Sequence, residues 1–281
     1  MKILCIGCLH GKFPKKAYSV VKKEEISLIL CPGDLADGSF MRDMEFKHWD
    51  RLHEGVSLID LIGKKRYRQA VEHSLKSQLD MAKKLERFKL PVLLISGNHD
   101  IQLGDISPKN KKRYKKYALE VLAHHSKYIH FLQVGVANFH GQEIGCISGY
   151  RAPAHKGITH HEGRSSPIIS LTNRMWDLQL KTIFKNFTNK KEAIFMCHDP
   201  PYKTKLDKVR NKASPMDGKH LGDEYVLRYL KKYQPKFVVC SHMHENQGKV
   251  QIGKTTVVNC GPAYAGRFAV MDTEKKTVKL Y

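Results

Sequence analysis

The stretch Val92-Leu93-Leu94-Ile95-Ser96-Gly97-Asn98-His99-Asp100 joins a short apolar run to a cluster of polar side chains. The apolar run is rich in branched residues, which is typical of a buried β-strand, and the glycine after it indicates a loop. Polar groups in loops at the carboxyl ends of strands build the sites of α/β proteins. The stretch therefore predicts both an α/β fold and the position of a site within it.

Four other segments repeat this order of an apolar run followed by side chains that bind metals. The runs are Lys2 to Gly7, Ile26 to Cys31, Ala193 to Met196 and Phe237 to Cys240, and the groups after them are Cys8, His10, Asp34, His198, His242 and His244. Imidazole, carboxylate, amide and thiol donors together suit Zn²⁺, Mn²⁺ or iron better than Mg²⁺ or Ca²⁺. The residues alone thus indicate a metal-dependent hydrolase.

The order of the predicted elements favours a layered α/β fold. Strands are predicted at about 2–7, 26–31, 92–96, 129–132, 143–149, 193–197 and 236–241, with a closing antiparallel set near 247–251, 254–259, 266–272 and 276–280. Apolar residues at helical spacing predict helices over 66–88 and 173–187. This order predicts two packed mixed sheets flanked by helices.

The length of 281 residues favours a single domain over residues 1–281. The stretch 39–65 is longer than a connection needs, and its apolar residues lie among charges, so we expect a helical insertion near 39–90 that lies over the site. Arg151 follows a predicted strand and begins an irregular stretch, so we expect it to contact the substrate. No apolar run is long enough to span a membrane or to act as a secretory signal, so we expect a cytoplasmic protein.

Taken together and in this order, the five motifs resemble those of the calcineurin-like metallophosphoesterases. That family has D-x-H, G-D, G-N-H-D/E, a lone H and G-H-x-H, and the resemblance spans residues 8–244. It implies a four-layer α/β/β/α sandwich that holds two metal ions. Two positions differ from the family pattern, because Cys8 stands where the family has Asp and Ser241 where it usually has Gly.

The resemblance also implies a role for each residue of the motifs. Asp34 would bridge the two ions; Cys8, His10 and His244 would complete the first site, and Asn98, His198 and His242 the second. His99, beside Asn98, would lie over the substrate and donate a proton or hydrogen bond to the leaving oxygen. Asp100 would fix the tautomer of His99 and raise its pKa. The nucleophile would be a hydroxide that bridges the metals.

Cys8 decides which metals the first site prefers. As a thiolate it keeps the negative charge of the family's Asp, and as a soft donor it favours Zn²⁺ or iron over Mn²⁺. If the thiol does not bind, the first site is weak or empty. Three more of the seven cysteines, Cys31, Cys197 and Cys240, lie just before ligand motifs and are either further ligands or small buried residues.

The chain carries 49 basic and 27 acidic residues, a net charge of +22 that attracts polyanions. The densest basic run, 109–117, contains Tyr114 and Tyr117. It is either a surface that binds phosphates and stacks bases or a solvated helix face.

These observations favour a phosphatase or phosphodiesterase that acts on a nucleotide, a cyclic nucleotide or a nucleic-acid end. One alternative is a non-catalytic interaction module on the same fold, which Cys8 favours. The other is a nuclease like that of the double-strand-break repair complex, against which the short chain after His244 argues.

Overall fold

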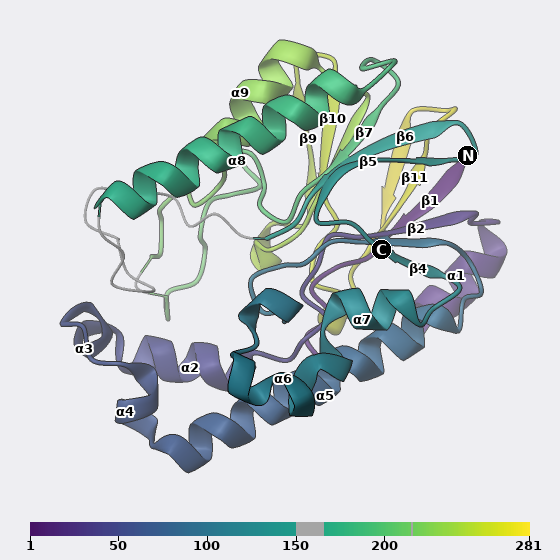
Figure 1. Ribbon diagram of the computed structural model, residues 1–281. Helices are drawn as coiled ribbons and strands as arrows, with labels where there is room; N and C mark the ends of the chain where they lie inside the picture. Colours follow the sequence, from purple (N-terminus) through teal and green to yellow (C-terminus); the bar gives the residue numbers. More distant parts are fainter. Residues whose placement is uncertain (150–165, 215) are drawn as a thin grey trace.

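In the computed structural model, which describes residues 1–149, 166–214 and 216–281, two six-stranded sheets pack face to face (Figure 1). The first sheet has the order β12-β11-β1-β2-β3-β4 and the second β5-β6-β7-β8-β10-β9. The strands of the first sheet are β1 (Lys2–Cys5), β2 (Leu28–Cys31), β3 (Val92–Leu94), β4 (Ile129–Phe131), β11 (Ala269–Asp272) and β12 (Thr277–Leu280). Those of the second are β5 (Val134–Phe139), β6 (Gln142–Ile147), β7 (Ile194–Met196), β8 (Phe237–Cys240), β9 (Gly248–Ile252) and β10 (Thr255–Asn259).

Alternate residues of the central strands face the two sides of the first sheet. Ile3 and Cys5 of β1 point toward the second sheet and pack in one cluster with Phe237 and Val239 of β8. Leu4 of β1 points the other way, toward the helices. Both faces of these strands are therefore buried, which explains why their sequences read as continuous apolar runs.

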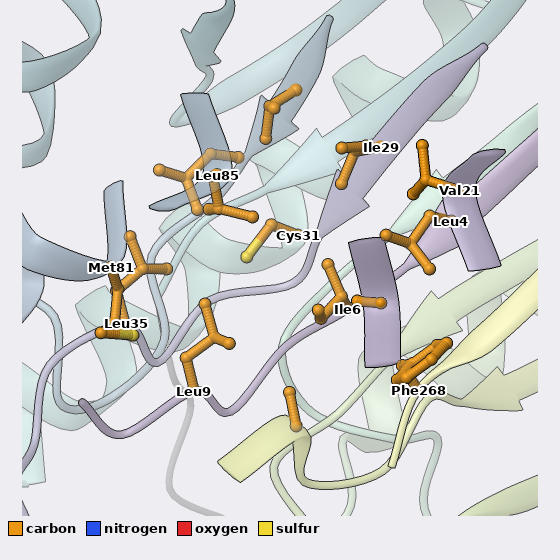
Figure 2. Close-up of a cluster of buried hydrophobic side chains, with 14 of the residues drawn as sticks. Leu4, Ile6, Leu9, Val21, Ile29, Cys31, Leu35, Met81, Leu85 and Phe268 are labelled. Carbon is orange, nitrogen blue, oxygen red and sulfur yellow. The ribbon is translucent and has the colours of Figure 1, made fainter. Parts of the chain in front are cut away.

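Helices cover the outer face of each sheet. The helices α1 (Lys16–Lys23), α5 (Lys64–Glu86) and α7 (Leu119–His124) lie against the first sheet. Figure 2 shows Val21 of α1 beside Leu4, and Met81 of α5 beside Leu35. The helices α8 (Ser166–Asn186) and α9 (Glu224–Tyr233) lie against the second sheet. The predicted two-sheet sandwich with flanking helices is confirmed.

The strand prediction was incomplete at one sheet edge and wrong about the closing strands. Strand β5 was not predicted; it lies at an edge and is only half-buried, so its apolar pattern is weak. The last four strands do not form one antiparallel set. The β9-β10 hairpin joins β8 through a parallel pairing of β10, whereas the β11-β12 hairpin joins β1.

Between β2 and β3, the region expected to be a helical insertion contains α2 (Ser39–Lys47), α3 (Trp49–His53), α4 (Leu58–Ile62) and α5. The C-terminal part of α5 packs on the first sheet, and its N-terminal half extends beyond the sheet with α2, α3 and α4 (Figure 1). One further short helix, α6 (Lys111–Tyr114), lies in the basic run. Among the described residues, no helix is both long and apolar enough to span a membrane.

Candidate metal centre

The predicted metal ligands come together where the carboxyl ends of strands from both sheets meet. Cys8 and His10 follow β1, Asp34 follows β2 and Asn98 follows β3 in the first sheet; His198 follows β7, and His242 and His244 follow β8, in the second. Residues that are distant in sequence thus become neighbours, because parallel strands end at the same edge of a sheet.

Four of these residues form a first ligand group. The donor atoms of Cys8, His10, Asp34 and His244 all lie within 4.8 Å of one another. Nε2 of His10 is 3.1 Å from Nε2 of His244 and 3.6 Å from Oδ2 of Asp34. The Cys8 sulfur is 4.0 Å from the same carboxylate oxygen. Two imidazole nitrogens, a sulfur and a carboxylate oxygen therefore surround one point, which fits a tetrahedral metal ion.

A second ligand group shares Asp34 with the first. Donor atoms of Asp34, His198 and His242 also lie within 4.8 Å of one another. Nε2 of His198 is 3.2 Å from Oδ2 of Asp34. Oδ1 of Asn98 lies 3.0 Å from Nε2 of His198 and 3.1 Å from Nδ1 of His242. Asp34 is the member common to both groups, in the position that a bridging ligand requires.

The backbone holds four of the ligand residues in the left-handed region. The φ angles of Cys8, His10, Asp34 and His242 are 50°, 41°, 60° and 63°. Residues other than glycine adopt this conformation at a cost of roughly 1–2 kcal/mol each, and such strain gathers at functional sites. Backbone hydrogen bonds between the two loops, such as Leu9 N to Asp34 O at 2.7 Å, hold the conformation in place.

Gly97 allows the loop after β3 to touch the loop after β2. A Cβ on Gly97 would lie 2.3 Å from Oδ1 of Asp34 and 2.5 Å from Cε1 of His198. Any larger residue would therefore push apart two of the candidate ligands. The glycine of the G-N-H-D motif thus serves close packing against the bridging carboxylate.

Asp100 has contacts that differ from the expected pairing with His99. Its carboxylate accepts hydrogen bonds from the backbone N–H groups of Asp34 (2.7 Å), Leu35 (2.7 Å), Ala36 (3.1 Å) and Gly97 (2.9 Å). These four bonds join the loop after β2 to the loop after β3. Asp100 therefore positions the loop that carries Asp34.

His99 lies beside the two ligand groups and belongs to neither. Its backbone N–H donates to Oδ1 of Asp34 at 2.9 Å. Its half-buried ring meets the His10 ring edge-on, with centroids 5.2 Å apart, and leans against Gly38. This place suits a group that faces a substrate. Arg151, expected to contact the substrate, lies outside the described residues.

The charges of the centre are dominated by a coupled pair. Burial disfavours the charged form of Asp34, but the charge and hydrogen bond of His198 hold the pKa of the Asp34 carboxyl well below its ordinary value. Burial also disfavours a charged His198, and Asp34 outweighs it and raises the pKa of His198 to about 9. Without ions, the pair is therefore a carboxylate and an imidazolium.

The other imidazoles of the two groups are neutral without ions. Burial and neighbouring histidines lower the pKa of His10 and of His242, and they lower the pKa of His244 to about 3. Burial and the charge of Asp34 raise the pKa of the Cys8 thiol well above its ordinary value. A divalent ion at the centre must therefore displace protons from Cys8 and His198, whereas three imidazoles already have the form that binds metals.

Three supporting groups were not predicted. The carbonyl of Pro32 lies 2.6 Å from Nδ1 of His198, and that of Ala36 lies 3.2 Å from Nδ1 of His10, so both leave Nε2 directed at the centre. The Tyr264 hydroxyl is 3.4 Å from Nδ1 of His244. A sequence gives no signal for carbonyl partners, although Tyr264 shares with the ligands a place shortly after a strand.

Cys31, Cys197 and Cys240 pack in the core, and most of the basic run is exposed. Cys31, Cys197 and Cys240 are fully buried, and within the described part of the chain they belong to neither ligand group. Tyr114 is also buried, and its hydroxyl donates to Glu72. A buried ring cannot stack on a base, so the arrangement of this run favours the solvated helix face.

The comparisons with known proteins agree with this geometry. A family model described as calcineurin-like phosphoesterase matches residues 1–246. The chain therefore belongs to the calcineurin-like phosphoesterases, a family of hydrolases that depend on two metal ions.

Individual relatives are distant. An uncharacterized protein of Methanocaldococcus jannaschii is 32% identical over 95 residues, which are 33% of this chain and 40% of that protein. Among solved structures, the TT1561 protein of Thermus thermophilus has a TM-score of 0.57 at 14% identity, covering 100% of this chain and 97% of the other. A dimetal phosphatase from Danio rerio has a TM-score of 0.54 at 12% identity, covering 96% and 91%. Likenesses at such identities establish the shared fold.

Proposed function

We propose that this chain hydrolyses phosphomonoesters or phosphodiesters of nucleotides, cyclic nucleotides or nucleic-acid ends at a dinuclear metal centre. The observation that carries the proposal is the position of Asp34. Its carboxylate belongs to both ligand groups, and a shared carboxylate is what holds two ions close together. The ions, when bound, lower the pKa of a water molecule and neutralise charge on the phosphate.

The residues of this chain have three further roles: binding the ions, donating to the leaving oxygen and positioning the loops. Cys8, His10 and His244 hold one ion and Asn98, His198 and His242 the other. His99 lies next to Asp34 and outside both groups, so it is free of a ligand role and donates a proton or hydrogen bond to the leaving oxygen. Asp100 keeps the loops of both motifs in register through its four backbone hydrogen bonds.

The donor set also limits the metals. A fully buried thiol 4.0 Å from Asp34 accepts a hydrogen bond from the backbone N–H of His242 at 3.2 Å. That donor stabilises a thiolate, and a thiolate favours Zn²⁺ or iron in the first site. The net charge of +22 supports an anionic substrate such as a nucleotide.

Elemental analysis followed by a substrate panel tests this proposal. Protein purified without added metal should contain Zn or iron near two ions per chain, and it should hydrolyse a chromogenic phosphodiester or monoester. Loss of activity with a chelator and recovery with Zn²⁺ would support the assignment. Metal-loaded protein that is inactive on the whole panel would favour the alternative of a non-catalytic interaction module.

A further inference from the structure

The segment between β2 and α5 is attached to the metal centre at two separate places. At its start, Gly38 touches His99: a Cβ on Gly38 would lie 2.0 Å from Nδ1 of the His99 ring. Further along, Trp49 of α3 packs against a buried apolar cluster that contains Met243. Met243 stands between His242 and His244, which belong to different ligand groups. Gly38 and Trp49 lie on either side of α2 in the chain, so each flank of this helix is attached to a residue or cluster of the centre.

The second attachment is an apolar cluster that joins three parts of the chain. Val209 and Met216 come from the stretch that follows His198, Met243 comes from the loop after β8, and Trp49 comes from α3. Val209, Met216 and Met243 are each at least nine-tenths buried, and the indole of Trp49 packs on them. Among the described residues of α2, α3 and α4, Trp49 is the one that belongs to this cluster.

Helix α2 is long compared with the spacing of the histidine rings of the centre. Successive ring centroids from His99 to His10 and from His10 to His244 are 5.2 and 4.9 Å apart. A helix of nine residues such as α2 is about 14 Å long. That length is greater than either ring-to-ring distance, and it exceeds the roughly 4 Å between two bridged ions.

We propose that Trp49 is a positioning residue that holds α2 and α3 as a wall along the side of the centre where His10 and His244 lie. This inference rests on the proposed phosphoesterase function and narrows its substrate class. When a phosphodiester inside a long polymer binds at a metal centre, the polymer must extend away from the centre on both sides of that bond. A wall on one side admits small phosphoesters and chain ends and excludes internal bonds.

Because of its net charge, the protein needs a steric means of excluding internal phosphodiester bonds. A chain with a charge of +22 attracts any polyanion, including long nucleic acids that are not substrates. Charge alone therefore does not separate a nucleotide from an internal phosphodiester. The wall formed by α2 and α3 excludes internal phosphodiesters sterically, and specificity often depends on such clashes with the wrong substrate.

Hydrolysis of two substrates by matched variants tests the wall. The substrates are bis(p-nitrophenyl) phosphate, which is small, and circular single-stranded DNA, which has no ends. The wild-type protein should hydrolyse the first and leave the second intact. Trp49→Ala should retain the small-substrate rate and gain activity on circular DNA on the order of tenfold over the wild type.

Two variants serve as controls. Trp49→Phe keeps an aromatic ring in the cluster and should exclude circular DNA as the wild type does. Phe40→Ala removes an exposed ring from α2 outside the Trp49 cluster and should also behave as the wild type. Folded, metal-loaded Trp49→Ala without a gain on circular DNA would overturn the proposal, as would cleavage of circular DNA by the wild type.

A fluorescence measurement separates the wall from the enzyme activity. The chain has two tryptophans, so Trp176→Phe leaves Trp49 as the sole emitter. Zn²⁺ loading should change the Trp49 emission, because the cluster on which Trp49 packs contains Met243, and Met243 lies between two ligands. If the wild type is inactive on the small diester while the emission change is present, the phosphoesterase proposal is wrong and the position of Trp49 beside the centre is supported. If bound Zn²⁺ leaves the Trp49 emission unchanged, the proposal that Trp49 positions α2 and α3 at the centre is wrong.

Discussion

Cys8 is the residue at which this chain departs most from the pattern of its family. It is fully buried, its φ angle is 50°, and its sulfur accepts a hydrogen bond from His242. A residue used only for packing gains nothing from a left-handed backbone, whereas a ligand gains its direction toward the ion. The local geometry therefore favours a thiolate ligand over a packing role.

X-ray absorption of the metal-loaded protein tests Cys8 directly. A thiolate ligand should give one metal–sulfur path at about 2.3 Å. Cys8→Asp should remain active with a preference shifted toward Mn²⁺, because a hard oxygen replaces sulfur at the same charge. Cys8→Ser should lose affinity for the first ion. A fully active Cys8→Ser, together with a wild type lacking a sulfur path, would exclude the ligand role.

Asp34 is the residue that the two candidate ligand groups share. Asp34→Ala removes the one carboxylate shared by the two ligand groups, so we expect both ions to be lost and hydrolysis to be abolished. Elemental analysis and the phosphodiester assay measure the two effects. Retention of both ions by this variant would contradict a bridging role.

His99 should affect the rate and not the metal content. His99→Ala leaves both ligand groups complete, so two ions should remain bound. The rate should fall on the order of 10²–10⁴-fold for poor leaving groups and less for activated ones, because those need little proton donation. Loss of metal together with the rate would show that His99 is a ligand.

The loops after the strands are the elements that make the site. Three left-handed residues, Cys8, His10 and Asp34, and the four amides bound by Asp100 fix the loops after β1, β2 and β3 through contacts within the chain. A preformed arrangement of this kind lowers the cost of ordering ligands on metal binding. Small changes in these loops should therefore weaken metal binding more than equal changes elsewhere.

Gly97→Ala is a small substitution in these loops that should have a large effect on metal binding. The added Cβ would lie 2.3 Å from Oδ1 of Asp34 and 2.5 Å from Cε1 of His198, so we expect weaker binding of the second ion and a loss of stability of a few kcal/mol. Gly104→Ala is the matched control, because its Cβ would meet nothing within 4 Å. Metal titration and thermal unfolding compare the two. Equal behaviour of both variants would contradict the close approach.

At the scale of the whole molecule, the metal centre couples folding to pH. The raised pKa of His198 stabilises the metal-free protein fully below its ordinary value of 6.5, and this stability is lost as the pH rises through about 9. The lowered pKa values of His10, His242 and His244 act in the opposite sense. Their contribution is present above 6.5 and is lost as the pH falls, through about 3 in the case of His244.

Thermal unfolding between pH 5 and 8.5 should therefore show a stability maximum near pH 6.5 for the metal-free protein. Zn²⁺ loading should abolish the decline on the alkaline side, because the ion takes the place of the His198 proton. Proton release on loading at neutral pH, measured by calorimetry in several buffers, should be about two per chain, from Cys8 and His198. Stability that rises steadily up to pH 8.5 without metal would contradict this view.

The sequence by itself determined the fold class and the family, and it predicted which side chains would gather at one candidate metal centre. Each of these signals is local: an apolar run of strand length, then a glycine or polar turn, then a donor side chain. A strand buried on both faces must end at a loop, so the order of motifs along the chain already predicts which residues meet.

Only the tertiary structure decided the remaining features. It assigned the β9-β10 and β11-β12 hairpins to different sheets, bound the Asp100 carboxylate to backbone amides, and packed Trp49 on the cluster that contains Met243. Each of these depends on packing between segments far apart in the chain. Local periodicity says that a residue is buried but not against what, because that choice is made by the fit of all the surfaces at once.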